Sequence, residues 1–326
     1  MPRINLKVSG GNKTQNQVRY VQQPFFTKSI TEASKGAVTT TFGSLEDLGI
    51  QGPEVLRLLR LGMFDISEGT LSYMAGDAPQ FEALDLPGLT ADITIQRRMV
   101  DAYRAELSKV MAERFGVRLL SMSPIALQGF YCKGKIANLE DLKGKKIRTY
   151  NRVMAELVEA LGAQSVNITF AEVVPALERG VADCSVSGTS AGNTARWWEV
   201  TDSLVMMPMG WAMTFFGANA SSWNRLDAAT QKFLTEQFAA MEDRQWTQAS
   251  ADIQDGINCN TAKGECKDGI VATRPMTLVT LSDGELKQVQ ELLKDKVLKD
   301  WAKRCGADCY ATWKSTAGAV IGLDKE

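Results

Sequence analysis

The most restrictive feature of this sequence is a repeated alternation of strand and helix patterns in its middle part. Two strand–helix pairs and a third strand follow one another between Lys145 and Ser187, and each helix pattern stops at a glycine, Gly162 or Gly180. Such alternation implies a mostly parallel sheet with helices on both faces. The sequence therefore predicts a compact α/β unit at about residues 127–211.

The rest of the chain extends this pattern into a two-lobed organisation. A chain of 326 residues is long enough for two domains of about 150 residues each. No low-complexity linker is present, so we expect two lobes joined by several crossing segments. We expect lobe I at 1–126, with 212–258 crossing back to it and containing a long helix that spans both lobes. Lobe II is expected at 127–211, and 259–326 should pack on the body of both.

Composition excludes several classes of function. The chain contains no histidine, which removes Ser-His-Asp and Cys-His mechanisms. It also lacks a Ser-x-x-Lys motif, a Gly-x-Gly-x-x-Gly motif and a complete phosphate-binding loop. The 37 basic and 38 acidic side chains give a net charge of -1, which provides no footprint for nucleic acid. We therefore expect no catalytic residue, cofactor, metal site or nucleic-acid partner.

The six cysteines indicate an oxidising compartment. Four of them bracket two short polar loops, as the pairs Cys259 with Cys266 and Cys305 with Cys309. These spacings favour disulfides over the alternative of a four-cysteine zinc site. The sequence leaves open whether the last two, Cys132 and Cys184, form a third bridge or remain buried thiols. Disulfides imply an exported protein whose leader has been removed, and no apolar run approaches the 18 or so residues of a membrane span.

Arg148 is the first candidate for ligand binding. It ends a predicted parallel strand just before a helix, where ligands of open α/β sheets bind. Its guanidinium matches the geometry of a carboxylate, although the alternative is a solvated basic patch. Trp211 lies in the predicted crossing segment, where it lines a cleft or belongs to the core. Ser187 follows a strand and is able to bond a ligand or merely to form a turn.

Two adjoining stretches of lobe II resemble a known family. The string NLEDLKGKKIRTYN, followed by LGAQSVNITFAEVVPALERGVADCSV, is similar to the DctP-type substrate-binding proteins of tripartite ATP-independent periplasmic (TRAP) transporters. The leucine-glycine-alanine turn, the glutamate-valine helix and the glycine-valine-x-aspartate strand recur in order. Weaker similarity extends through most of the chain. The resemblance implies a two-lobed periplasmic-binding-protein (Venus flytrap) fold that closes on an organic acid in a cleft between its lobes.

The resemblance also assigns ligand-binding positions. Arg148 matches the family arginine that pairs with the ligand carboxylate. The other positions that it implies are Asn151, Phe170, Ser187, Trp211, Thr70, Tyr73 and Tyr131. Sialic-acid binders have a second arginine where this chain has Tyr131, and the charged first-lobe residues are replaced by Thr70 and Tyr73. The glycine usual after the aspartate of the glycine-valine-x-aspartate strand is Cys184 here, so the path of that strand is left open.

These departures predict an aromatic, weakly charged pocket around one arginine. The expected ligand is a compact monocarboxylate, such as an aromatic, 2-oxo or 2-hydroxy acid. The implied protein is a periplasmic monomer that is not an enzyme and delivers its ligand to TRAP membrane subunits. Two alternatives are a sensory ligand-binding protein of the same fold and a lyase or isomerase that uses the same cleft.

Overall fold

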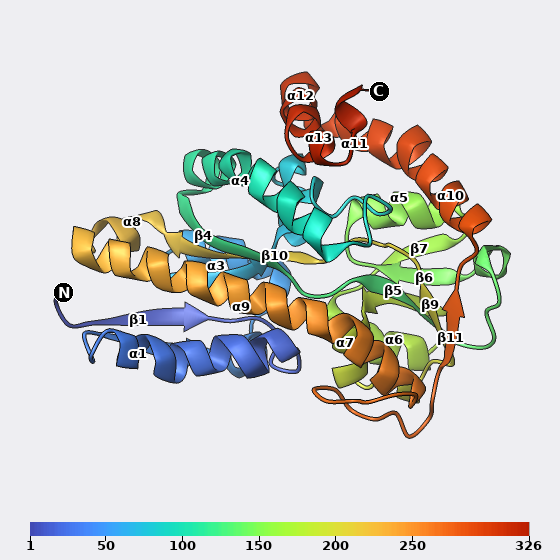
Figure 1. Ribbon diagram of the computed structural model, residues 1–326, viewed down its shortest axis with the longest axis horizontal. Helices are drawn as coiled ribbons and strands as arrows, with labels where there is room; N and C mark the ends of the chain where they lie inside the picture. The colour runs from blue at the N-terminus through green and yellow to red at the C-terminus, as the bar shows by residue number, and fades with distance from the viewer. Residues whose placement is uncertain (326) are drawn as a thin grey trace. The chain divides into compact units, whose positions relative to one another are not determined.

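The computed structural model describes residues 1–325, which divide into two compact units. Unit 1 consists of Met1–Met74, Arg104–Ile125 and Met213–Ser250. Unit 2 consists of Ala75–Tyr103, Ala126–Ala212 and the described residues from Ala251 onward. Two helices, α4 (Ile93–Phe115) and α9 (Ala228–Thr261), contribute residues to both units (Figure 1). The predicted two-lobed α/β class with a long shared helix is therefore confirmed.

Unit 1 is built on a five-stranded sheet with the order β2-β1-β3-β10-β4. The first three strands are parallel, and β10 runs antiparallel to both of its neighbours. The bounds are β1 (Ile4–Ser9), β2 (Val38–Gly43), β3 (Ile66–Thr70), β4 (Val117–Pro124) and β10 (Met213–Asn219). The short helical elements are η1 (Gln17–Gln22), η2 (Phe25–Ser29), α1 (Ile30–Ala33), α2 (Leu45–Leu48), η3 (Gly52–Glu54), α3 (Val55–Arg60), η4 (Leu71–Met74) and α8 (Ala220–Asn224).

The core of unit 1 contains aromatic side chains from three distant parts of the chain. Phe26 of η2, Phe216 of β10 and Phe238 of α9 lie with their ring centroids 5.5 to 5.9 Å apart. All three rings are buried. Burial of such rings is a main favourable term in folding, so this cluster fixes η2 and α9 against the sheet.

Unit 2 is built on a six-stranded sheet with the order β11-β9-β5-β8-β6-β7. The bounds are β5 (Gln128–Cys132), β6 (Lys146–Thr149), β7 (Gln164–Asn167), β8 (Cys184–Gly188), β9 (Ser203–Met206) and β11 (Thr277–Thr280). The helical elements are η5 (Pro79–Glu82), η6 (Leu139–Leu142), α5 (Arg152–Ala160), η7 (Phe170–Glu172), α6 (Val173–Glu178), α7 (Thr189–Thr194), η8 (Trp197–Glu199), α10 (Asp283–Leu292), η9 (Leu293–Val297), α11 (Leu298–Cys305), α12 (Ala307–Ser315), α13 (Ala317–Val320) and η10 (Leu323–Lys325). Strands β8, β6 and β7 are mutually parallel, which places their carboxyl ends at one edge.

Local sequence explains where the helices of this parallel part begin and end. The Asn151 side chain accepts a hydrogen bond from the Met154 amide at 2.9 Å and so caps the start of α5. Gly162 and Gly180 follow α5 and α6 with φ angles of 84° and 69°. Glycine adopts this left-handed conformation without strain, which is why the predicted stops are correct.

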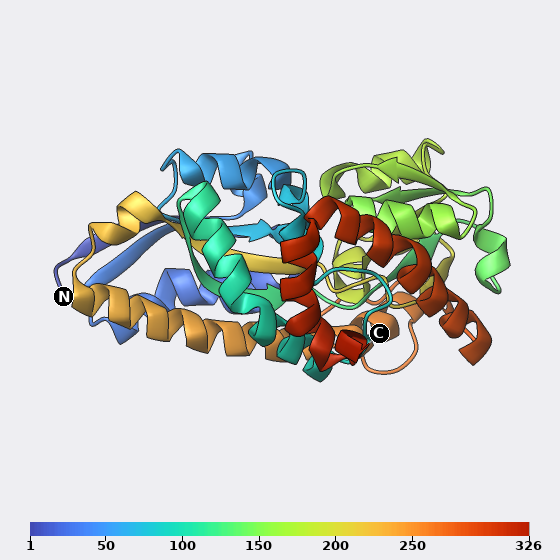
Figure 2. The same ribbon diagram turned by 90° about the horizontal axis from the view of Figure 1, so that it is seen from above.

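One predicted boundary differs from the structure. Residues 75–103 were expected in lobe I, but they belong to unit 2 together with 251–326. Tertiary hydrogen bonds explain this: the indole N–H groups of Trp301 and Trp313 donate to the carbonyls of Pro79 and Ala83. Figure 2 shows the C-terminal helices, in red, beside the green α5 that they contact through η9.

The six cysteines form three disulfides, Cys132–Cys184, Cys259–Cys266 and Cys305–Cys309. The first pairs residues directly opposite each other on β5 and β8. The disulfide prediction is confirmed, and the zinc alternative is wrong because the sulfur atoms bond to one another. Within residues 1–325, no helix combines the length and apolar character needed to cross a bilayer.

Candidate functional site

Arg148 lies near the carboxyl end of β6, in the interior of unit 2. Its side chain is 1% exposed. The Nε and Nη1 atoms donate to the carbonyls of Ile168 (2.7 Å) and Val186 (2.9 Å), and the guanidinium carbon lies 5.2 Å from the centroid of the Tyr150 ring. These contacts hold the plane of the guanidinium in one orientation. The basic-patch alternative for Arg148 is wrong, because that alternative requires a solvated side chain.

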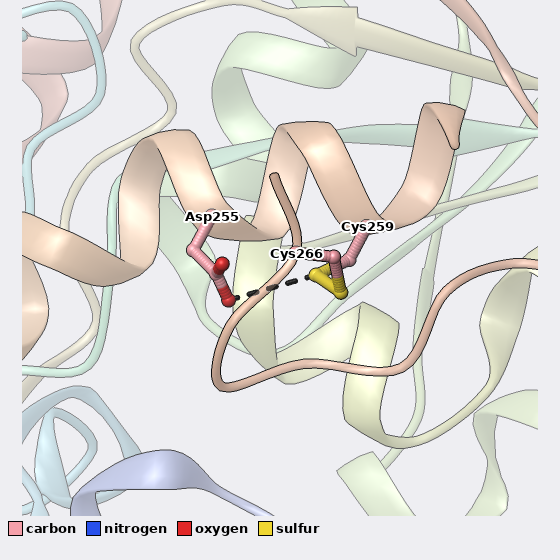
Figure 3. A group of neighbouring side chains, drawn as sticks. All are labelled: Asp255, Cys259 and Cys266. Carbon is pink, nitrogen blue, oxygen red and sulfur yellow. Dashed lines mark hydrogen bonds between the residues drawn. A yellow bond between two sulfur atoms is a disulfide. The ribbon is translucent and has the colours of Figure 1, made fainter. Parts of the chain in front are cut away.

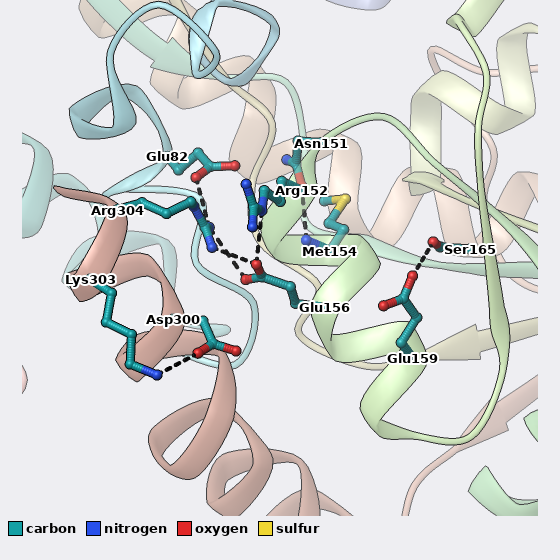
Figure 4. A network of polar contacts seen from close by, with 10 residues as sticks. All are labelled: Glu82, Asn151, Arg152, Met154, Glu156, Glu159, Ser165, Asp300, Lys303 and Arg304. Carbon is teal, nitrogen blue, oxygen red and sulfur yellow. Dashed lines mark hydrogen bonds and ion pairs between the residues drawn. The ribbon is translucent and has the colours of Figure 1, made fainter.

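Three buried polar atoms close to Arg148 along the chain or across the sheet have no hydrogen-bond partner among the described residues. They are Thr149 Oγ1, Asn151 Nδ2 and Ser185 Oγ. Ser185 is the register partner of Arg148 on β8, so their side chains share one face of the sheet, whereas Thr149, the next residue on β6, points to the other face. The Asn151 side-chain oxygen caps α5, as Figure 4 shows, whereas its amide nitrogen lacks a partner. Buried polar groups without partners cost free energy, so a polar ligand bound at Arg148 would supply a partner for the Ser185 hydroxyl on the same face of the sheet.

Tyr131 occupies the same row of the sheet, because it pairs with Ser185, which in turn pairs with Arg148. Its hydroxyl donates to the Thr189 carbonyl at 2.7 Å and accepts from Asn260 Nδ2 at 3.0 Å. Burial raises the pKa of this hydroxyl well above its usual value. The side chain is therefore a hydrogen-bonded part of the core, and a direct contact of Tyr131 with ligand stays a prediction.

Of the other predicted residues of unit 2, one is half-buried and two are fully buried. Phe170 is half-buried at the start of η7 and lies 5.4 Å from the Trp197 ring. Ser187 is buried on β8, two residues after Ser185 and on the same face. Trp211 is buried, and its indole N–H donates to the Thr90 carbonyl at 3.0 Å. Trp211 thus anchors the segment before α4, and its ligand role stays a prediction.

Thr70 and Tyr73 line a small pocket in unit 1. The polar residues of its wall are Asn12, Gln15, Glu68, Thr70, Tyr73 and Thr214. The structure thus brings the two predicted residues of lobe I together. It does not test the predicted cleft between the lobes, which stays a prediction.

Glu68 is the residue of this pocket that sequence reasoning missed. It lies on β3, between β1 and β10 in the centre of the sheet, and is 4% exposed. Burial raises the pKa of its carboxyl to about 7, and the Gln22 and Thr214 side chains beside it oppose this shift only in part. The weakly charged pocket predicted around Arg148 stays a prediction, because Arg148 belongs to unit 2 and does not line this pocket. The available signal was an acidic residue inside the strand pattern ISEGT.

One further group of metal-ligand side chains contains Asp255, Cys259 and Cys266 (Figure 3). The two sulfur atoms form a disulfide. The Asp255 carboxylate accepts hydrogen bonds from the backbone N–H groups of Lys267, Asp268 and Gly269. The group is accounted for as an anchor that fastens the disulfide loop to the end of α9.

Two compact α/β units with a buried arginine at the carboxyl end of a parallel strand define a solute-binding protein. The family comparison agrees with this class. The chain belongs to the bacterial extracellular solute-binding proteins, family 7 (DctP), whose model matches residues 10–304. The members of this family are solute-binding receptors.

Individual relatives are distant in sequence and close in fold. A solute-binding protein of Albidiferax ferrireducens is 26% identical over 251 residues, which cover 76% of this chain and 70% of that protein. Two other relatives are matched over only 37% and 54% of their own length. A Bordetella pertussis extracytoplasmic solute receptor that binds pyroglutamic acid is 24% identical, with a TM-score of 0.84 over 99% of this chain and 100% of that one. A TRAP periplasmic solute-binding protein of Desulfovibrio salexigens with bound orotic acid is 17% identical, with a TM-score of 0.86 over 97% and 98% of the two chains.

Proposed function

We propose that this chain is a periplasmic receptor that binds a small organic carboxylate and delivers it to the membrane subunits of a TRAP transporter. The observation that carries the proposal is the buried Arg148 at the carboxyl end of β6, with the unpartnered Ser185 hydroxyl in register with it and the unpartnered Asn151 amide at the start of the following helix. An arginine fork and nearby hydroxyl and amide donors match the two oxygen atoms of a carboxylate. Membership of the solute-binding family supports delivery of the ligand to a transporter over catalysis.

The proposed ligand is a compact monocarboxylate, such as an aromatic, 2-oxo or 2-hydroxy acid. The half-buried Phe170 ring beside Trp197 offers an apolar surface in the same unit as Arg148. The two receptors of similar fold described above bind pyroglutamic and orotic acid, which are both small ring-containing monocarboxylates. These features support a ligand of about that size and charge.

Ligand binding is proposed to act by population shift. A ligand that interacts more favourably with the closed form of a two-lobed receptor stabilises that form by its differential affinity. A micromolar dissociation constant corresponds to roughly 8 kcal/mol, which a buried arginine–carboxylate pair and apolar burial together are able to supply. We propose that the receptor acts as a monomer.

The test is a calorimetric titration of Arg148→Ala with the organic acid that raises the melting temperature of the wild-type protein most in a thermal-shift screen. The protein is first unfolded and refolded to remove any ligand from the expression host. We expect a loss of about 2 to 5 kcal/mol, or roughly 30-fold to several thousandfold, because the ligand carboxylate is left without its cation. Arg179→Ala, at an exposed arginine after α6 of the same unit, is the matched control. A loss of less than tenfold in Arg148→Ala would contradict the assignment.

A further inference from the structure

The turn that follows α3 in unit 1 presents two large apolar side chains to solvent. Leu61 is 71% exposed and Met63 is 56% exposed. The backbone N–H groups of Gly62 and Met63 donate to the carbonyls of Leu59 and Leu58, and Gly62 has a φ angle of 71°. In such a helix end the residue at the position of Met63 usually packs back on the helix. Here the same backbone geometry leaves both apolar side chains in water.

Hydrogen bonds place this turn beside two other chain segments of unit 1. The Asn219 side-chain amide donates to the carbonyls of Leu59 (2.9 Å) and Arg60 (3.3 Å) at the end of α3. The N–H group of Ala220, the first residue of α8, donates to the Gly116 carbonyl between α4 and β4 at 2.9 Å. The end of α3, the α4–β4 junction and the start of α8 therefore meet in one place.

Two arginines are held at the surface of this region by aromatic rings. The guanidinium carbons of Arg60 and Arg118 lie 5.5 and 5.1 Å from the ring centroids of Phe115 and Trp223. Both arginines are exposed and both rings are buried. Among the described residues, neither guanidinium belongs to an ion pair. The rings thus orient two cations whose N–H donors are not spent on carboxylates.

The other charged groups keep this surface cationic. Arg57 pairs with Glu54 at 3.6 Å, and the Asp65 carboxylate accepts a hydrogen bond from a backbone N–H group of β1. Arg114 lies next to Glu113, the remaining exposed acid. We call this region the α3-tip surface, which consists of Arg57, Arg60, Leu61, Met63, Arg114 and Arg118.

The α3-tip surface combines two chemistries that one kind of partner satisfies together. A guanidinium matches the oxygen atoms of a phosphate group, and exposed apolar side chains gain free energy when they leave water. The headgroup region of a phospholipid bilayer offers phosphate groups directly above an apolar layer. A soluble phosphate ester or a nucleic acid offers phosphate but leaves Leu61 and Met63 in water.

We propose that the α3-tip surface attaches the protein reversibly to bilayers that contain anionic phospholipids. The surface lies within unit 1 and does not include Arg148, so the binding itself is independent of the carboxylate site. Weak attachment would raise the concentration of the protein beside a partner embedded in the same membrane. That consequence, unlike the attachment, rests on the proposed function.

The experiment is co-sedimentation of the full chain with vesicles. One set of vesicles contains phosphatidylglycerol and phosphatidylcholine in equal parts, and the other contains phosphatidylcholine only. We expect the partition coefficient of the wild-type protein to be at least tenfold higher for the anionic vesicles. It should fall as the salt concentration rises, because salt screens the attraction between exposed charges.

Substitutions separate the cationic contribution from the apolar one. Arg60→Gln and Arg118→Gln should each lower the partition coefficient for anionic vesicles about fivefold. The double substitution Leu61→Ser and Met63→Ser should lower it about tenfold, because the apolar tip no longer gains from leaving water.

Two exposed residues of unit 2 provide matched controls. Arg179→Gln makes the same change in net charge away from the α3-tip surface. Val271→Ser removes an apolar side chain that is 56% exposed, as Met63 is. Both controls should partition as the wild-type protein does. Circular dichroism verifies that each variant folds.

The inference is overturned if the wild-type protein binds both kinds of vesicle equally, or if Arg179→Gln weakens binding as much as Arg60→Gln does. It is also overturned if the double serine variant keeps full binding, or if free glycerol phosphate displaces the protein from the vesicles. Absence of any vesicle binding would instead favour an acidic protein partner and equally overturn it. Carboxylate binding, measured by calorimetry on the same variants, should stay unchanged, which keeps this test separate from that of the proposed function.

Discussion

Arg304 holds a buried ion-pair cluster together inside unit 2 (Figure 4). Its Nη2 atom lies 3.1 Å from Glu82 Oε2 and 3.3 Å from Glu156 Oε2, and its Nη1 atom also pairs with Glu156. The Glu82 side chain is 2% exposed and that of Arg304 is 16% exposed. Arg304→Met keeps much of the apolar stem but leaves the buried Glu82 carboxylate without its cation, while Glu156 keeps only its ion pair with the exposed Arg152. We expect the free energy of unfolding to fall by about 3 to 5 kcal/mol near pH 8, the usual effect of breaking a buried pair.

The loss of stability in Arg304→Met should be larger at high pH than at low pH. Burial raises the pKa of Glu82, and the Arg304 charge is the largest factor that lowers it. Without Arg304 the pKa of Glu82 in the folded state rises further. A carboxyl group whose pKa is higher in the folded than in the unfolded state stabilises the folded state at pH values below the unfolded-state pKa. This stabilisation is lost as the pH rises through the folded-state pKa. The variant should therefore lose more stability at pH 8 than at pH 5, where Glu82 takes up a proton.

Urea denaturation followed by tryptophan fluorescence at pH 5 and pH 8 measures both effects. Lys303→Met, one residue away, is the control, because Lys303 is 78% exposed and pairs with Asp300 at the surface. That control should lose less than about 1 kcal/mol. The reasoning is refuted if Arg304→Met costs no more than Lys303→Met at pH 8, or if its cost is larger at pH 5.

Two further predictions concern stability. Glu68→Gln should raise the free energy of unfolding by up to about 3 kcal/mol at pH 8 and leave it unchanged at pH 4. The reason is that burial raises the pKa of Glu68 in the folded state to about 7, so the wild-type protein loses stability as the pH rises through that value. Equal melting-temperature shifts at both pH values would count against it. Replacing Cys132 and Cys184 by serine should cost about 4 kcal/mol, against about 2 kcal/mol for Cys259 and Cys266, because their sequence separations are 52 and 7. Denaturation midpoints in the reverse order would contradict the chain-entropy argument.

The sequence by itself determined the features that depend on local interactions. Strand and helix periodicity predicted the alternating elements of unit 2, and glycines marked the ends of α5 and α6. Arg148 was singled out because a strand pattern ends there and a helix pattern follows, and it lies buried at that point. The disulfides Cys259–Cys266 and Cys305–Cys309 close short loops, so their pairing was also readable from spacing.

Tertiary structure alone decided the features that depend on distant segments. Cys132 pairs with Cys184 because β5 and β8, separated by 52 residues, become neighbours in the sheet. Residues 75–103 join unit 2 because their carbonyls accept hydrogen bonds from tryptophans more than 200 positions away. Glu68 becomes a buried acid only when β1 and β10 close on both sides of β3. Periodicity reports which face of an element is apolar, but burial of a single polar group depends on which partners the whole chain brings to it.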